Sequence, residues 1–203
     1  MRTIIASAAA AVLATLGIAP AAAQDGSSYV QAHGGLFFVT ADEGELLGLN
    51  IEVDYDMGFA LGALAGRRLS PNLAVEAEFT YHANDVSSFE VDLGSVDITA
   101  PIEEDPIDAD VFTLMANAVY ELPVQGASFT PYVGGGIGYA DVWDEDDVDG
   151  TFAYQVKAGV DFPMGRNAFG VEASYLGTSG FEEDTTELDY GGIGVLATYK
   201  FGF

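Results

Sequence analysis

The chain has 203 residues, a formal net charge of −26 and no cysteine. This length allows one domain or at most two, and the lack of cysteine excludes disulfide frameworks, thiolate nucleophiles and zinc–thiolate sites. Two histidines, His33 and His82, give almost no basis for a multi-histidine metal site. With 6 basic residues against 32 acidic ones, the chain offers no basic patch for nucleic acid.

The N-terminal segment has the features of an export signal. Arg2 supplies a charged start, an Ala-rich apolar run follows as far as about Ile18, and residues 21–23 are all alanine, a pattern typical of cleavage sites. We expect cleavage after Ala23, which leaves residues 24–203 as the mature domain. The alternative is an N-terminal membrane helix, but the run is short. After cleavage no stretch of about 18 apolar residues remains to span a membrane as a helix.

The mature chain alternates apolar and polar residues with a period of two, which is the pattern of β-strands. In residues 73–82, for example, the odd positions from Leu73 to Tyr81 are apolar, whereas Glu76, Glu78 and Thr80 occupy the other face. Eight segments of this kind follow one another in chain order: 29–40, 53–68, 73–84, 109–122, 129–143, 151–163, 168–179 and 188–203.

The connections between these segments alternate in length. After the second, fourth and sixth strands they are tight, at residues 69–72, 123–128 and 164–167, and contain the Pro, Gly and Asn that turns require. After the first, third, fifth and seventh strands they are longer and acidic, and the longest lies near residues 85–108.

This arrangement predicts an all-β fold, an eight-stranded antiparallel up-and-down transmembrane β-barrel with short periplasmic turns and long acidic extracellular loops. Closure matters because a bilayer does not tolerate an unpaired sheet edge. The apolar faces would then point to lipid and the polar faces inward. The alternative is a soluble sandwich or lipocalin-like barrel, which would need many charged residues on the outward strand faces, and these strands carry few charges.

The eighth segment ends the chain on an aromatic residue. Its apolar face consists of Ile193, Val195, Ala197, Tyr199, Phe201 and Phe203. This resembles the C-terminal signal of bacterial outer-membrane proteins, in which alternating apolar residues end in Phe. The resemblance implies that the barrel assembly machinery of the outer membrane reads Tyr199, Phe201 and Phe203.

A second resemblance lies in TPYVGGGIGYA, residues 130–140. It is similar to the fifth-strand segment of the OmpA-like outer membrane protein beta-barrel superfamily, and in particular of small alphaproteobacterial-type surface barrels. The resemblance implies an outer-membrane location in a Gram-negative cell, among membrane lipid and lipopolysaccharide. We interpret the glycines as steric, since they allow a strand to bend or bulky neighbours to fill space. Because the chain stops with the barrel, no peptidoglycan-binding domain is expected.

The polar face of the strands predicts the content of the barrel interior. Eight strands enclose a space that side chains just fill, and buried ions are tolerated when they are paired and hydrogen-bonded. We expect a plug of ion pairs, in which Lys157 and Lys200 bind the carboxylates and Arg68 contributes. The predicted lumen network is Arg68, Glu76, Glu78, Lys157, Glu172 and Lys200. The alternative to a plug is a narrow cation-preferring channel or small-molecule transporter along the surplus carboxylates; a wide porin channel is not expected.

The acidic loops raise the question of cation binding. Oxygen ligands in clusters suit hard cations such as Ca²⁺, and the candidate loop contains Asp144, Glu145, Asp146, Asp147 and Asp149. Its spacing does not match an EF-hand loop. The alternative is a solvated, self-repelling rim without a bound ion. A loosely bound divalent cation could bridge these carboxylates to anionic lipopolysaccharide; no other cofactor is expected, and the sequence names no external ligand.

One group of residues has to be tested for catalysis, because some outer-membrane barrels modify lipids with Ser and His. His82, Asp85, Ser87 and Ser88 lie near the predicted outer rim. A working site needs a nucleophile, a base and a group that orients the base, and the sequence supplies only the residue types. We interpret His82 as a polar rim residue and His33 as an inward-pointing packed residue. The sequence therefore predicts a non-enzymatic barrel with a structural or surface-interaction role.

Overall fold

The computed structural model describes the backbone of residues 28–40, 42–46, 49–55, 57–92, 97–101, 107–142, 150–179, 181–183, 186–188 and 190–202, and the side chains of residues 28–40, 57–84, 110–141, 150–179 and 190–202. The predicted signal segment 1–23, the predicted cation loop with Asp144, Glu145, Asp146, Asp147 and Asp149, and the terminal Phe203 lie outside these residues.

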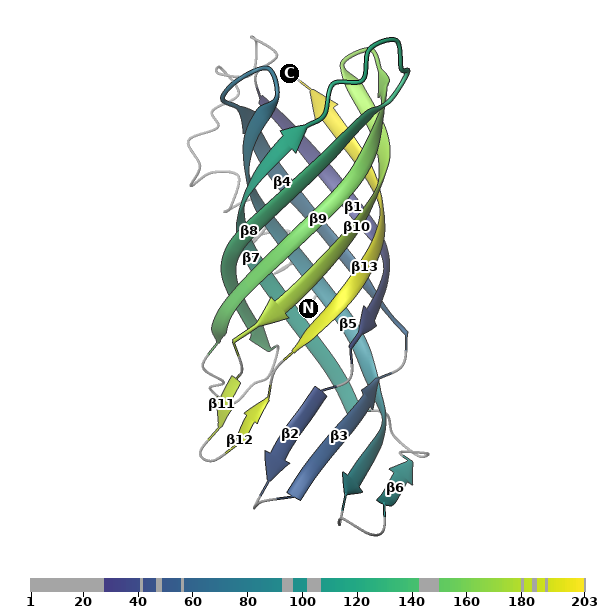
Figure 1. The fold of residues 1–203 in the computed structure, drawn as a ribbon, viewed down its shortest axis with the longest axis vertical. Coiled ribbons are helices and arrows are strands. Elements are labelled where there is room, and N and C mark those ends of the chain that lie inside the picture. The colour runs from purple at the N-terminus through teal and green to yellow at the C-terminus, as the bar shows by residue number, and fades with distance from the viewer. Residues whose placement is uncertain are drawn as a thin grey trace, which may run out of the picture.

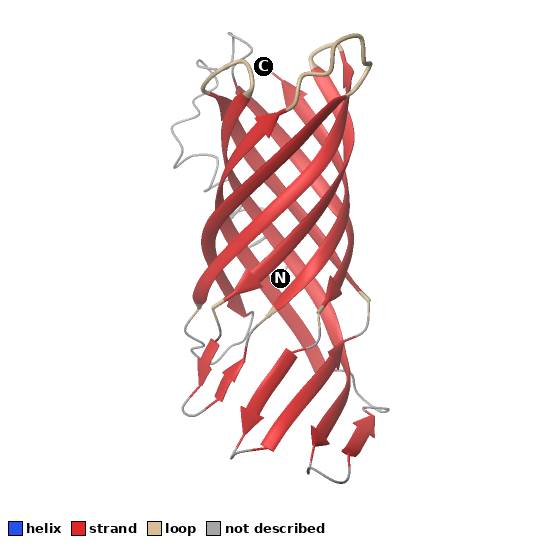
Figure 2. Cartoon of the chain, in the orientation of Figure 1, coloured by secondary structure: helices blue, strands red, loops and turns tan. Residues whose placement is uncertain are grey.

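Eight long antiparallel strands form the barrel wall (Figure 1). In order they are β1 (Ser28–Val39), β4 (Gly58–Arg68), β5 (Leu73–Asp92), β7 (Ile107–Glu121), β8 (Thr130–Val142), β9 (Thr151–Met164), β10 (Asn167–Thr178) and β13 (Gly191–Gly202). Each pairs with its predecessor and its successor, and β1 also pairs with β13, which closes the sheet. The predicted fold class is confirmed, and the described residues contain strands and turns without a helix (Figure 2).

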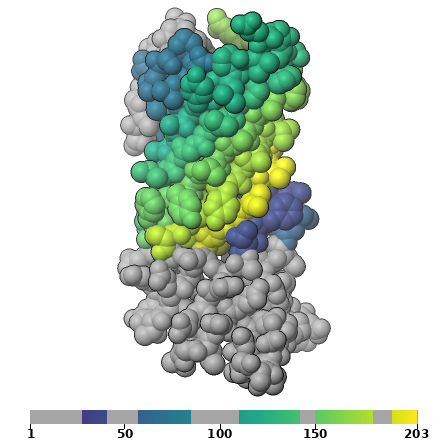
Figure 3. Space-filling view, in the orientation of Figure 1, coloured from purple at the N-terminus to yellow at the C-terminus, as the bar shows by residue number. Residues whose placement is uncertain are grey.

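The direction of the side chains follows the predicted alternation. Large apolar side chains are exposed on the outer surface of the wall, among them Leu61, Ile137 and Val156 at 57–60% of their maximum. Charged and amide side chains such as Glu78 and Gln155 are buried inside. Figure 3 shows this wall from one side as a continuous surface of packed side chains. A soluble barrel would have the opposite distribution, so the outward apolar band is the feature that suits lipid.

At one end of the barrel the connections are short, as predicted. The turn between β9 and β10 consists of Gly165 and Arg166, and Gly165 has a φ of 68°, which suits a tight hairpin. The β4–β5 connection is held by the Leu69 and Ser70 amides, which donate to the Leu73 carbonyl at 2.8 and 3.2 Å.

At the other end the structure corrects the prediction. The segment 53–68 is not one strand, because residues 53–55 belong to a separate strand, β3 (Leu49–Tyr55), and β4 starts at Gly58. The segment 85–108 is not a plain loop either. There β5 continues to Asp92 and pairs on one side with β3 and on the other with β6 (Asp97–Pro101).

Short strands extend this outer end further. β2 (Asp42–Leu46) pairs with β3, so that β2, β3, β5 and β6 form a sheet beyond the barrel, and β11 (Phe181–Glu183) pairs with β12 (Thr186–Leu188) as a separate hairpin. Figure 1 shows these strands below the closed part of the barrel. The physical reason is visible in β3, where apolar residues alternate with acidic ones and support strand pairing outside the membrane as well.

Candidate functional site

The centre of the lumen is built around the ammonium group of Lys157 on β9. Its Nζ donates to Glu76 Oε2 at 2.7 Å and to Glu78 Oε2 at 2.9 Å, both on β5, and lies 3.9 Å from Glu172 Oε2 on β10. All four side chains are buried. One cation therefore holds carboxylates from two different strands across the barrel, and we call these four residues the central cluster.

Neutral donors also hydrogen-bond to the carboxylates of the central cluster. The Tyr29 hydroxyl donates to Glu76 Oε1 at 2.5 Å, and the Tyr132 hydroxyl donates to Glu172 Oε2 at 2.8 Å. Glu78 accepts from Asn117 Nδ2 at 2.8 Å, from Gln155 Nε2 at 3.3 Å and from Thr80 Oγ1 at 3.3 Å. Buried charges are tolerated when they are paired and hydrogen-bonded in this way.

Strand register explains why these residues meet. Glu76 lies opposite Asn117, Asn117 opposite Gly136, and Gly136 opposite Gln155, so that one level runs across β5, β7, β8 and β9. Gln155 Nε2 donates to Asn117 Oδ1 at 2.7 Å across the strand that carries Gly136. A side chain at position 136 would fill the space that this hydrogen bond crosses.

Lys200 does not join the central cluster, which differs from the prediction. Its Nζ donates to Asp161 Oδ2 at 2.5 Å. Gly170 on β10 lies between the two strands, opposite Asp161 on one side and opposite Thr198 on the other. Because Gly170 has no side chain, Asp161 can reach across β10 to the lysine. The rings of Tyr29 and Tyr132 flank the ammonium at 4.9 and 5.4 Å, which adds cation–π attraction.

Arg68 also lies apart from the central cluster, at the short-turn mouth of the lumen. Its Nη2 donates to Glu121 Oε1 at 2.9 Å, with 31% of the Arg68 side chain and 18% of the Glu121 side chain exposed. The guanidinium lies over the Tyr29 ring at 5.2 Å. The predicted network thus divides into three ion-paired groups along the axis: the mouth pair, the Lys200–Asp161 pair and the central cluster.

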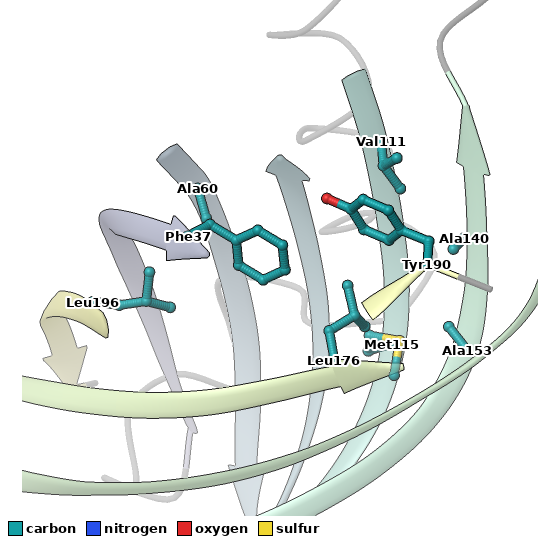
Figure 4. Close-up of a cluster of buried hydrophobic side chains, with 9 residues drawn as sticks. All are labelled: Phe37, Ala60, Val111, Met115, Ala140, Ala153, Leu176, Tyr190 and Leu196. Atoms are coloured by element: carbon teal, nitrogen blue, oxygen red, sulfur yellow. The ribbon is translucent and has the colours of Figure 1, made fainter. Parts of the chain in front are cut away.

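The outer half of the lumen contains an apolar cluster, which the sequence analysis missed. Phe37, Met115, Leu176 and Leu196 come from β1, β7, β10 and β13 and point into the interior together with Tyr190 (Figure 4). The cluster is completed by Ala60, Val111, Ala140 and Ala153. The available signal was an apolar residue at an inward position, such as Phe37 beside the lipid-facing Phe38, where both faces of a strand become apolar.

Both histidines lie inside the barrel. His82 is buried, with its ring centroid 4.5 Å from that of Phe37, so the interpretation of His82 as a rim residue is wrong. The cause is that β5 continues beyond the barrel wall as far as Asp92, so position 82 comes well before the outer end of its strand. Nε2 of His33 lies 2.9 Å from Thr80 Oγ1, as expected for a packed inward residue.

The position of His82 bears on lipid chemistry. Its side chain faces the lumen and not the lipid, and among the described residues its Nδ1 atom has no hydrogen-bond partner. A general base needs an orienting partner there. The side chains of Asp85, Ser87 and Ser88 lie outside the described residues.

The described part of the lumen carries more acid than base. The buried charged side chains are Glu76, Glu78, Asp161 and Glu172 against Lys157 and Lys200, a formal surplus of two negative charges. Within the same part of the chain, no group of three or more His, Asp or Glu side chains is arranged to hold a metal ion, and no helix is long and apolar enough to cross a membrane.

Comparison with known proteins gives one matching family and several solved structures with a similar fold. The family model described as outer membrane protein beta-barrel domain matches residues 8–201. No curated protein matches the chain significantly. The crystal structure of Neisserial surface protein A is similar, with a TM-score of 0.57 and 16% identity over 87% of this chain and 97% of the other. The outer membrane protein OprG from Pseudomonas aeruginosa has a TM-score of 0.53 and 16% identity over 86% and 96%. At this identity, both comparisons establish the barrel fold alone.

Proposed function

Because the chain belongs to the outer membrane protein beta-barrel domain family, we propose that it is an outer-membrane barrel with a structural or surface-interaction role, that its lumen is plugged by ion pairs, and that it is not an enzyme. The observation that carries the proposal is the central cluster. Its lysine and three glutamates are buried and hydrogen-bonded across the lumen.

The layers along the axis support a closed lumen. An ion entering from the short-turn end meets the Arg68–Glu121 pair first, then the Lys200–Asp161 pair and then the central cluster. An ion entering from the other end meets the apolar layer around Phe37 and Leu176, which it could cross only at a large desolvation cost.

Cysteine accessibility tests the plug, because the chain has no native cysteine. Ser174 lies on the lumen side of β10, opposite Lys157 on β9 and Gly194 on β13. In the refolded barrel, Ser174→Cys should resist a charged methanethiosulfonate reagent added from either side. The matched control is Ser70→Cys in the exposed β4–β5 turn, which should react at once.

Adding Lys157→Ala to the Ser174→Cys barrel should speed the reaction, because the cluster loses its central cation. Rapid labelling of Ser174→Cys with Lys157 intact would contradict the plug.

A narrow cation-preferring channel or small-molecule transporter is the second candidate. The surplus of two negative charges in the described lumen favours it, because uncompensated buried carboxylates attract cations. In that case the wild-type barrel would conduct cations in preference to anions, and Glu172→Gln would reduce the preference. Glu172 is the informative position because its nearest ammonium is 3.9 Å away.

A lipid-modifying enzyme is the weakest candidate, since His82 is buried in the lumen beside Phe37. His82→Ala should leave lipid composition unchanged in cells that express the barrel. Loss of a lipid modification in that variant would contradict the non-enzymatic role.

For the acidic end we propose that divalent cations link the barrel to lipopolysaccharide. Glu43, Glu52 and Glu90 occupy directly opposite positions on β2, β3 and β5, and like charges placed in this way destabilise a sheet unless they are screened. Millimolar Ca²⁺ should raise the urea midpoint of the barrel in membranes that contain lipopolysaccharide, and less in phosphatidylcholine. An unchanged midpoint in both membranes would contradict the proposal.

A further inference from the structure

The short-turn end of the barrel carries two arginines on its outer surface. Arg67 is the penultimate residue of β4 and lies one position before the inward Arg68, so it faces outward and is exposed. Arg166 is exposed in the turn between β9 and β10. We propose that Arg67 and Arg166 each bind the anionic headgroup of a phospholipid in the leaflet at this end.

Register places the two arginines three of the eight wall strands apart. Arg67 lies opposite Ser28 on β1, and the amide of Gly202 on β13 donates to the Arg166 carbonyl at 3.0 Å. The two positions are therefore separated by three strand spacings, about 14 Å around the wall. One headgroup does not span this interval around the curved wall, so each arginine binds a lipid of its own.

The surface between the arginines continues the lipid-facing band. Val30 on β1 lies opposite Phe201 on β13, which is 42% exposed. Phe201 in turn lies opposite Asn167, the residue after Arg166. Both guanidiniums thus stand where the apolar band ends, which is the level of lipid phosphates. This continuity favours a membrane lipid over a free phosphate ion, because the acyl chains of the lipid also contact the apolar band.

The charges at this end fit an anionic ligand. Arg68 is already paired with Glu121, whereas neither Arg67 nor Arg166 has an ion pair within the described residues. The short connections 69–72, 122–129 and 165–166 contain no Asp or Glu. A guanidinium offers a planar fork of donors that matches phosphate oxygens, and each basic residue near the surface favours anionic lipid.

Lipid selectivity measured by electron spin resonance tests the site. The refolded barrel is placed in phosphatidylcholine vesicles with trace spin-labelled phosphatidylglycerol or spin-labelled phosphatidylcholine, and the association constants of the two labels are compared at low salt. We expect the wild type to prefer phosphatidylglycerol by up to about fivefold for each arginine. The preference should fall when salt is raised, because exposed charges are screened.

The decisive comparison is between arginines. Arg67→Gln together with Arg166→Gln should reduce the preference to near unity, whereas Arg68→Gln, which removes a single charge from the same end, should retain it. Resistance to cold SDS checks that each variant is folded. Equal selectivity in the wild type and the double variant, or a loss in Arg68→Gln as large as in the double variant, would overturn the proposal.

Discussion

Lys157 is the residue on which the closed lumen depends most. It is the cation nearest to Glu76, Glu78 and Glu172, and all of these side chains are buried. A buried ion pair adds little net stability compared with an apolar substitute, but the removal of one partner leaves an uncompensated charge and is costly. The consequence of losing Lys157 should therefore exceed that of losing a half-exposed arginine.

Replacing Lys157 by Met tests this argument. We expect Lys157→Met to lower the free energy of unfolding by about 3–5 kcal/mol, measured by urea titration of the refolded barrel. Arg68→Gln should cost about 0–1 kcal/mol, because its pair with Glu121 is partly exposed. Adding Glu78→Gln to Lys157→Met should restore part of the loss. A Lys157→Met barrel as stable as the wild type would show that the cluster does not need its cation.

For individual residues, the sequence predicted which side chains point inward but not which of them form ion pairs with each other. Period-two alternation assigned Glu76, Lys157 and Glu172 to the lumen, because the side-chain direction in a strand is local information. The partner of Lys200 depends on the relative register of β9, β10 and β13 and on the missing side chain at Gly170. No local pattern in the sequence contains that information.

The element in which glycine matters most is β8, where the glycines alternate between the lumen and the lipid. A Cβ built on the lumen-facing Gly136 would lie 1.9 Å from Asn117 Oδ1 and 2.6 Å from the Ala116 carbonyl. A Cβ on its outward neighbour Gly135 would come no nearer than 3.4 Å to any atom. This fits the steric interpretation of the TPYVGGGIGYA segment.

Gly136→Ala and Gly135→Ala therefore form a matched pair. Gly136→Ala should destabilise the barrel by about 1–3 kcal/mol through overpacking, because Asn117 must leave its hydrogen bond with Gln155. Gly135→Ala should be neutral or slightly stabilising. The urea midpoints of the two variants decide the matter, and equal midpoints would show that the space beside Asn117 is not limiting.

The strand β13 carries the predicted assembly signal. The ring centroids of Tyr199 and Phe201 are 4.5 Å apart. Phe203 lies outside the described residues. We expect Phe201→Ser with Phe203→Ser to reduce the amount of barrel that reaches the outer membrane in cells, while refolding into detergent proceeds. Phe169→Ser, which removes a lipid-facing ring from β10, is the control. An equal loss in the control would assign the effect to stability and not to recognition.

The outer strands are the elements that the sequence analysis did not predict. The sequence places residues 41–52 and 85–108 in long acidic connections between strands. Yet Ile51 and Val53 on β3 alternate with the acids and lie opposite Val91 and Phe89 on β5. Strand pairing continues beyond the barrel because β5 extends without interruption to Asp92 and fixes the register of β3 beside it.

For the whole molecule, the described residues form a closed barrel with an apolar outer surface and a filled interior. Composition, an even number of alternating segments and alternating loop lengths were sufficient to predict this architecture. Apolar residues at inward positions signal the apolar layer around Phe37 and Leu176, but the sequence alone does not separate this signal from a slip in strand register. We expect the apolar layer and the ion-paired layers together to close the lumen from both ends.

Planar-bilayer conductance of the refolded mature barrel, with and without millimolar Ca²⁺, tests closure most directly. We expect silent membranes with the wild type under both conditions, because the central cluster and the apolar layer lie in series along the lumen. Steady cation-selective steps from wild-type barrels would contradict the plug and support a channel along the surplus carboxylates.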